Sequence, residues 1–432
     1  MPLLRILGVA FGVAIIVGTS IGAGILRTPG AVAAQLGSGP LALFAWTVGG
    51  VYALLGAAAL AELATSIPKS GGFYVYARRA LGDGFGFAVG WADWVNNCAA
   101  VSYASVVMGE FLALLIPSLT PQIRTVAAAT IVGVGLLQWC GMSVSSRLQE
   151  ASAFIKAIAF LSFIVALLVL PVSNADEAPA IAHALPGFVS IVLAMQLVLG
   201  AYDGWQSGLY FAGEDRDPTR NLPRAFIGGA FLVLVVYVLM NIALLRVLPI
   251  ATLAGSALPA ADAARAVLGA RGETIVTILA VLSPLSIISG VLLSAARVPY
   301  AMGSDGLMPG AAGFVDQRGT PSVGLLLSTI VALALLGTGT FESIATVFAF
   351  FAITSYVGAF VSLLVLRRRE PDLPRPFRSW GYPWTTIVVL AGACSLLGGL
   401  VAGAPRQSLI AIAALAASYP VFRLTRVRSV RL

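Results

Sequence analysis

Two short segments of this 432-residue chain combine glycine with polar side chains inside long apolar stretches. The first is 18–30 (GTSIGAGILRTPG) and the second is 200–208 (GAYDGWQSG). A continuous helix gains nothing from this pattern, because each interior glycine costs about 1 kcal/mol relative to alanine. Non-helical backbone is tolerated at membrane depth only where protein or a cavity receives its free polar groups. We therefore expect both segments to be helix breaks that line a cavity; the alternative is that their glycines serve close helix–helix contacts.

The peptide groups freed at such breaks suit a small zwitterion. A half-helix beginning near Gly24 would aim free N–H groups and the positive end of its dipole at a carboxylate. The carbonyl groups of Thr19 and Ser20, which end the preceding half-helix, would suit an ammonium group. Those of Gly200 and Ala201 would do the same from the second break. This predicts that backbone groups recognise an α-amino acid and that side chains select among substrates.

Several ionisable side chains also fall inside apolar segments, where a charge is costly and marks a candidate site. Lys156 is one of only two lysines, and a buried lysine, unlike an arginine, can give up its proton. It either takes the place of a bound cation such as sodium, holding the first break, or is a snorkelling or structural lysine. Asp203 either faces a substrate amine or caps a half-helix. Structural pairing is the expectation for Asp93 and Glu110, and either snorkelling or a place in the extracellular vestibule for Arg27.

The elements that must position these residues are membrane-spanning helices. The chain is 59% hydrophobic and only 10% charged, whereas soluble domains carry about a quarter charged residues. A span needs roughly 20 apolar residues. Twelve segments meet or approach this requirement: 8–35, 40–66, 84–116, 123–141, 148–171, 186–212, 224–248, 274–301, 322–338, 343–366, 384–403 and 407–422. The sequence therefore predicts an all-α polytopic membrane protein.

The distribution of basic residues predicts the orientation. With a cytoplasmic N-terminus, the inner connections hold 19 lysines and arginines and the outer ones hold 5, so both termini are expected in the cytoplasm. Glu214 is expected to form a charge network with its neighbours in 215–224 that locks an inner gate. The longest outer connection, 249–272, should contain a short helix near 260–269. The net charge of +8 is interpreted as contact with anionic lipids rather than with nucleic acid.

The polar residues of the chain offer little other chemistry. The three cysteines lie in apolar segments and the single histidine, His183, lies in a connection, so neither a metal site nor a disulfide framework is expected. No cofactor is predicted. A membrane-embedded enzyme would need convergent acid–base groups or a metal cluster, and a sensor would normally carry an added soluble domain, so both remain remote alternatives.

Four motifs carry a family resemblance. They are 13–29 (VAIIVGTSIGAGILRTP), 201–205 (AYDGW), 213–225 (GEDRDPTRNLPRA) and 296–309 (ARVPYAMGSDGLMP). Together, and in this order, they resemble the amino acid–polyamine–organocation superfamily, and especially its L-amino-acid transporter branch. The resemblance covers most of the chain. It implies one transmembrane domain, 1–432, with a LeuT-type fold of two inverted five-helix repeats, 8–171 and 186–367, and two peripheral helices within 384–422.

The resemblance also implies roles for particular residues. The substrate carboxylate would bind at the turn Gly22-Ala23-Gly24, and the amine would bind carbonyl groups near Thr19, Ser20, Gly200 and Ala201. Lys156 resembles the lysine that replaces sodium in this family and links span five to spans one and eight. Ser286 or Ser289 would be its nearest hydroxyl partner in span eight.

Three departures bear on selectivity, and one of them is that Leu26-Arg27 replaces an apolar stretch that contains phenylalanine in the family. Ala23 stands where the branch usually has serine, which removes a hydroxyl from the carboxylate site. Gly200 stands where a bulky aromatic gate is common, so either the pocket is wider or Tyr202 acts as the gate. Which amino acid is carried therefore stays open.

The function implied is secondary amino-acid transport by alternating access, as a sodium-independent exchanger or a proton-coupled permease. A polyamine or other organic-cation carrier of the same fold is the alternative, in which Asp203, with Glu110 as a further candidate, binds a second amine. The loop 117–123 lacks a cysteine, so no disulfide-linked heavy chain is expected. The arginine-rich, lysine-poor and alanine-rich composition suggests a bacterial inner membrane.

Overall fold

The computed structural model describes residues 3–172, 186–338 and 341–429. Within these ranges every regular element is a helix, and the only strand-like pairing is one isolated backbone bridge between Leu7 and Asp215. The predicted all-α membrane architecture is therefore confirmed at the level of fold class. His183 lies outside the described residues.

Nine helices in the described ranges are long and apolar enough to cross a membrane, or ten if one bent pair counts as a single span. The bent pair is α1 (Val9–Ser20) with α2 (Ala23–Leu36), whose axes differ by 48°. Two of these spans combine an α-helix with a short 3₁₀ helix. In one, η1 (Pro117–Gln122) precedes α6 (Ile123–Gln138), and in the other, η2 (Ser207–Glu214) follows α8 (Phe188–Tyr202). The others are α3 (Gly39–Ser66), α5 (Asp83–Leu115), α7 (Met142–Val169), α9 (Pro218–Val247), α12 (Ala270–Ser304), α14 (Phe341–Arg369) and α15 (Trp384–Gly403).

Two expected spans are shorter than a full crossing. The apolar helix α13 (Ser322–Thr338) has 17 residues. The segment predicted as one helix over 407–422 is divided, because α16 (Pro405–Ala416) ends where Ala417 forms a turn and α17 (Ser418–Ser429) follows. The count of twelve spans and the inverted repeat therefore stay predictions.

The connections contain helices of their own. The long outer connection holds α10 (Ile250–Gly255) and α11 (Pro259–Leu268), so the short helix predicted near 260–269 is confirmed. Both pack against α2. The sequence pattern did not predict α4 (Phe73–Leu81), which packs on α5 and α14, or the single turn η3 (Gly310–Gly313).

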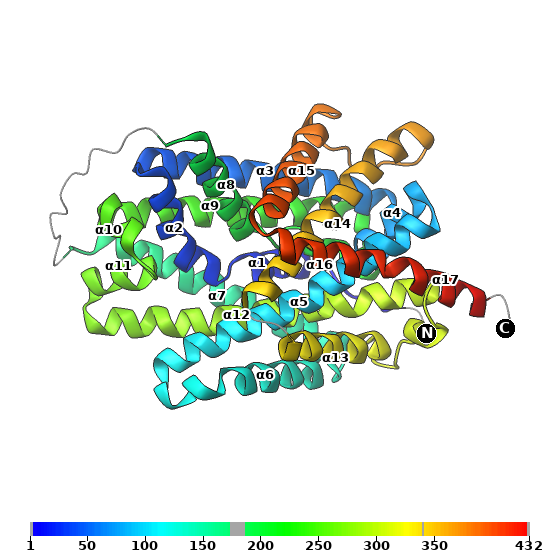
Figure 1. Cartoon of the computed structure of the whole chain (residues 1–432), viewed down its shortest axis with the longest axis horizontal. Helices are drawn as coiled ribbons and strands as arrows, with labels where there is room; N and C mark the ends of the chain where they lie inside the picture. The colour runs from blue at the N-terminus through cyan, green and yellow to red at the C-terminus, as the bar shows by residue number, and fades with distance from the viewer. Residues whose placement is uncertain (1–2, 173–185, 339–340, 430–432) are drawn as a thin grey trace.

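The broken pair α1 and α2 lies inside the bundle (Figure 1). α1 packs against α9, α7 and α12, and α2 packs against α8. In Figure 1, α6 and α13 lie along one side of the bundle and α15 lies along the other. α5 connects the two sides, since it contacts α12, α13 and α14. The two glycine-rich segments of the sequence are thus held in the middle of the molecule, surrounded by complete helices.

Candidate binding site

The first break consists of two residues in extended backbone. Ile21 ends α1 with φ −73° and ψ 102°, and Gly22 precedes α2 with φ −134° and ψ −165°. The last carbonyl groups of α1 and the first N–H groups of α2 therefore lack partners within their own helices. α2 begins at Ala23, one residue before the predicted start near Gly24. The predicted break in span one is present.

Side chains from three other helices bind the carbonyl groups at the end of α1. Lys156 Nζ on α7 donates to the Gly18 oxygen at 2.6 Å. Tyr237 on α9 donates to the Ser20 oxygen at 2.7 Å. Ser283 on α12 donates to the Ile21 oxygen at 3.0 Å.

The second break comes directly after α8 and touches the first. α8 extends to Tyr202, so Gly200 and Ala201 belong to its last turn, and the non-helical residues are 203–206. Gly204 has φ +120°, and a methyl group added there would lie 2.6 Å from the Ser20 nitrogen. Only glycine fits this combination of backbone angle and close approach. Thr19 Oγ1 lies 3.1 Å from the Gly204 oxygen and 2.9 Å from Ser207 Oγ. The two segments singled out in the sequence therefore meet.

A cavity of about 500 Å³ lies where the two breaks meet, bounded also by α5 and α12. This volume is within the usual range of small-molecule sites, about 300–1,000 Å³. The predicted binding residues that line this cavity are Thr19, Ser20, Gly22, Gly24, Gly200, Ala201 and Asp203. Of Ala23 only the backbone is described, as the first residue of α2.

Tyr202 is not among the residues that line this central cavity. It is 1% exposed, and its hydroxyl donates to the Trp46 carbonyl on α3 at 2.9 Å. In this conformation its side chain points toward α3, and the two alternatives, a wider pocket or a Tyr202 gate, stay predictions. A methyl group added at Gly200 would meet nothing within 4 Å, so the place usually taken by an aromatic gate is open.

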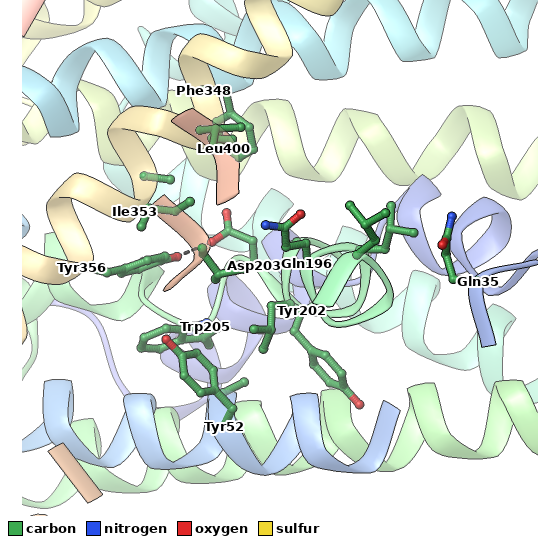
Figure 2. A pocket seen from close by; sticks show the side chains of 18 residues that line it. Gln35, Tyr52, Gln196, Tyr202, Asp203, Trp205, Phe348, Ile353, Tyr356 and Leu400 are labelled. Carbon is green, nitrogen blue, oxygen red and sulfur yellow. Dashed lines mark hydrogen bonds between the residues drawn. The ribbon is translucent and has the colours of Figure 1, made fainter. Parts of the chain in front are cut away.

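A second cavity, of about 460 Å³, lies on the other side of α8, where α3, α14 and α15 form its walls (Figure 2). Gln196, Gly200 and Asp203 line both cavities. The Asp203 carboxylate accepts a hydrogen bond from the Tyr356 hydroxyl on α14, which Figure 2 shows as a dashed line. No lysine or arginine in the described ranges forms a salt bridge with Asp203. Its carboxyl group thus lies at both cavities without a basic partner in the described structure.

Lys156 is 6% exposed and, as far as the chain is described, its ammonium pairs with no carboxylate. Neither predicted hydroxyl partner bonds to it. Ser286 Oγ instead lies 3.2 Å from Ser152 Oγ, and the Ser289 carbonyl accepts from Gln138 at 2.8 Å. The hydroxyl of α12 that does reach the break is Ser283, one helical turn away from Ser286. The two predicted serines and Lys156 line a common groove between α6, α7 and α12.

The partner of Glu214 differs from the one expected. Its carboxylate pairs with Arg297 on α12 through contacts of 2.6 and 2.7 Å, and both side chains are buried. The predicted network with its neighbours in 215–224 is wrong, since Glu214 points inward while the Asp217–Arg220 pair is exposed. Arg297 is one of the 19 basic residues that the sequence predicts in the inner connections, but it lies inside α12 and also packs over the Phe211 ring at 4.2 Å. This pair joins η2 to α12.

The other ionisable residues of the spans fall into two groups. Asp93 is fully buried and accepts hydrogen bonds from Tyr210 at 2.6 Å and Asn97 at 3.0 Å, in line with the expected structural pairing. Arg27 is exposed, lines the central cavity and lies 5.9 Å from the Phe111 ring centroid. The vestibule and snorkelling interpretations of Arg27 both stay predictions. Glu110 is half-buried.

Comparison with known proteins identifies the family. Residues 9–416 match the family model described as amino acid permease. The chain belongs to the amino acid permease family. It is 27% identical over 399 residues to the serine/threonine exchanger SteT of Bacillus subtilis, covering 91% of this chain and 90% of the relative. It is 31% identical over 383 residues to the mouse b(0,+)-type amino acid transporter 1, with 86% and 78% covered. It is 26% identical over 406 residues to the branched-chain amino acid permease BcaP of Lactococcus lactis, with 89% and 87% covered.

Family membership and the apolar helices together make this permease an integral, multi-pass membrane protein. The match also spans both breaks and the Glu214–Arg297 pair. The resemblance stated from the four sequence motifs is therefore confirmed.

Several residues of the permease site were not predicted from the sequence. Asn96 and Asn97 of α5, and Gln206 and Ser207 of the second break, line the central cavity. The Asn96 amide oxygen is buried without a hydrogen-bond partner in the described structure. Two adjacent amide side chains within an apolar span are as unusual as a lysine there, so the sequence contains a signal that could have identified Asn96 and Asn97. The sequence contains no such signal for Tyr237, because a tyrosine in an apolar helix is ordinary.

Proposed function

We propose that this chain is a secondary active amino-acid transporter that works by alternating access. One observation carries the proposal: two helix breaks meet at a cavity in the interior of a membrane protein, where both contribute polar groups to its lining. Interrupted helices of this kind place half-helix ends against a substrate at the repeat interface of known transporter folds. The names of the bacterial and animal relatives, which are amino-acid exchangers, transporters and permeases, support the same class.

In this proposal the backbone holds the α-amino and carboxylate groups. The free N–H groups at Gly22, Ala23 and Gly24 begin α2 and face the carboxylate with the positive end of the helix dipole. Carbonyl groups at the ends of α1 and α8, those of Thr19, Ser20, Gly200 and Ala201, receive the ammonium group. The position of the α1 and α2 ends at the cavity supports these assignments.

Side chains would then select the substrate. Asn96, Gln206 and Ser207 bring amide and hydroxyl groups to the cavity, and Ala23 leaves the carboxylate site without a hydroxyl. Buried polar groups favour substrates that can bond to them, because an unmatched group costs free energy.

Lys156 would take the place of a coupling sodium ion. Its ammonium holds the Gly18 carbonyl at the end of α1, where a metal ion would otherwise be needed to satisfy the exposed backbone. We therefore propose sodium-independent flux, either exchange or proton-coupled uptake. Ser286 and Ser289, which share a groove with Lys156, would contact it in another conformation.

The buried Glu214–Arg297 pair would close the inner gate, since it joins η2 to α12 beyond the second break. Alternating access then requires the inverted repeats 8–171 and 186–367, with the helices of 384–422 outside them. Both termini would lie in the cytoplasm of a bacterium, and no heavy chain or cofactor would be needed.

The test is uptake by purified protein in lipid vesicles. We expect labelled amino acid to accumulate only when the vesicles contain a counter-substrate or an inward proton gradient. Replacing sodium with choline should leave the rate unchanged, whereas a sodium requirement would refute the proposed role of Lys156. Loading vesicles with each amino acid in turn identifies the substrate. Absence of counterflow and of gradient-driven uptake for every amino acid would refute the proposed function.

A second candidate function has one specific observation in its favour. The Asp203 carboxylate lies between the two cavities with no basic partner in the described structure, which suits a diamine or another organic cation. Putrescine should then compete with neutral amino acids for uptake. Competition by putrescine that Asp203→Asn removes would favour the cation carrier.

A further inference from the structure

A groove on the outer surface of the bundle leads to Lys156. It has a volume of about 530 Å³, and α6, α7 and α12 form its walls. Large apolar side chains at its rim remain well exposed in the isolated chain: Leu137 43%, Leu148 41%, Ile155 60%, Leu282 51% and Leu285 41%. In a membrane such side chains face acyl chains. The groove therefore opens toward lipid and is distinct from the central cavity.

The floor of this groove is polar, in contrast to its rim. Ser152, Lys156, Ser286 and Ser289 all contribute to it. Lys156 lies near the middle of α7, so its ammonium is near the centre of the bilayer. An ammonium group has three donors, and the described structure assigns one of them, to the Gly18 oxygen.

We propose that this groove binds a long-chain fatty acid, with its tail along the apolar rim and its carboxyl group at Lys156. Charge complementarity selects a carboxyl group, because an ammonium without an acidic partner is costly at this depth. A phospholipid does not fit, because its head group stays at the interface, about 15 Å from the bilayer centre. A fatty acid reaches the centre as the neutral acid, and its carboxyl oxygen accepts a hydrogen bond from Nζ in either protonation state.

The ligand would act on transport through the Lys156–Gly18 contact, a step that rests on the proposed function. A carboxyl group at Nζ competes with the Gly18 carbonyl for the same ammonium. Loss of that contact frees the end of α1, so the bound fatty acid should inhibit uptake. A change in affinity or rate of about fivefold or more is typical of such coupling between sites.

Gly133 gives a clean way to close the groove. It lines the groove on α6, and a methyl group added there would meet nothing within 4 Å. Gly133→Phe therefore introduces a ring at the wall of the groove from a position where the first side-chain carbon meets no neighbour. Gly228 on α9 is also exposed and free of contacts within 4 Å, and it lines none of the three cavities described above, so Gly228→Phe is the matched control.

Binding is tested first, without reference to transport. The full chain in vesicles is exposed to a fatty acid that carries a photoreactive diazirine in its tail, and labelled peptides are identified by mass spectrometry. We expect labelling of α7 and α12 near Ile155 and Leu282, abolished in Gly133→Phe and retained in Gly228→Phe. Equal labelling by the corresponding fatty alcohol would overturn the role of the carboxyl group. Unchanged labelling of Gly133→Phe would overturn the location.

Transport is measured second, in the same vesicles. Oleate should slow uptake by the unmodified chain and by Gly228→Phe at least about fivefold, whereas Gly133→Phe should not respond. Oleyl alcohol should have no effect on any of the three. Labelling without inhibition would overturn the link to Lys156 while leaving the binding site in place. If no amino acid is carried at all, the proposed function fails, and the labelling result still decides this inference.

Discussion

The Tyr237 hydroxyl lies 2.7 Å from the carbonyl oxygen of Ser20, across the gap between α9 and the end of α1. The same hydroxyl lies 3.0 Å from the Ala201 oxygen at the end of α8. Tyr237 thus contacts two of the four carbonyl groups that the proposed site offers to a substrate ammonium, and it is completely buried. One side chain therefore ties together the two interrupted helices.

Removing this hydroxyl should impair transport. Tyr237→Phe keeps the ring but leaves buried carbonyl groups without a donor, at a cost of about 1–3 kcal/mol, so we expect uptake to fall about tenfold or more. Tyr419→Phe, at a residue that is 59% exposed, should leave uptake unchanged. Vesicle uptake at matched protein levels measures both. Equal rates for Tyr237→Phe and the unmodified chain would show that Tyr237 has no part in the site.

The proposed coupling role of Lys156 can be tested against the other lysine of the chain. Lys156→Met keeps the length of the side chain but cannot hold the Gly18 carbonyl, so transport should be lost while folded protein remains in the membrane. Lys69→Met, at an exposed position, should behave like the unmodified chain. Size-exclusion chromatography checks folding, and vesicle uptake checks function. Normal rates from Lys156→Met would remove the coupling role.

Two glycines at the second break should respond oppositely to the same change. Gly204→Ala places a methyl group 2.6 Å from the Ser20 nitrogen at a backbone angle that alanine rarely adopts, so it should disrupt the contact between the breaks. Gly200→Ala meets open space and should preserve expression and thermal stability. Melting temperature in detergent distinguishes the two. Equal stability of both variants would contradict the close approach of Gly204 to α1.

The buried Glu214–Arg297 pair predicts a strong effect of single substitutions. Glu214→Gln leaves the Arg297 charge buried without its partner, and breaking such a pair typically costs about 3–5 kcal/mol. The double variant Glu214→Gln with Arg297→Met removes the unpaired charge and should recover part of the lost stability. Thermal unfolding in detergent gives the comparison. A double variant less stable than Glu214→Gln would show that the pair does not act as a unit.

Asn96 is expected to affect selectivity rather than overall activity. Its unpartnered amide oxygen lies at the central cavity. Asn96→Leu removes this acceptor at similar size, so the ratio of polar to branched apolar substrates should shift toward the apolar ones by about tenfold. Competition by serine and by leucine for uptake of one labelled substrate measures the ratio. An unchanged ratio would exclude contact between Asn96 and the substrate side chain.

The interrupted helices could be predicted because glycine and polar residues are exceptional inside an apolar span. Both breaks in the structure fall within the predicted segments 18–30 and 200–208. The 3₁₀ helix η2, immediately after the second break, could not be predicted, since nothing in residues 207–214 distinguishes it from an α-helix.

Long-range partners were harder to predict than local structure. Glu214 is surrounded in sequence by arginines, yet it binds one 83 residues away. Proximity in sequence favours ion pairs between Glu214 and the neighbouring arginines. Burial determines the ion pair that forms, because water screens the charges of exposed side chains. Likewise Ser283, Ser286 and Ser289 look equivalent along α12, and only the rotation of that helix determines which one reaches the Ile21 carbonyl.

The Tyr237 hydroxyl has one hydrogen but lies within hydrogen-bond distance of two carbonyl oxygens, those of Ser20 and Ala201. It can therefore donate to only one of them at a time. If α1 and α8 separate as the transporter changes state, a protein without substrate leaves one of these buried carbonyl oxygens without a hydrogen-bond donor. An unsatisfied buried acceptor costs about 1–3 kcal/mol. The ammonium group of a bound substrate supplies the missing donor and removes that free-energy cost. Loaded protein would then reorient faster than empty protein, a kinetic asymmetry that favours the exchange mode of the proposed function over the proton-coupled one.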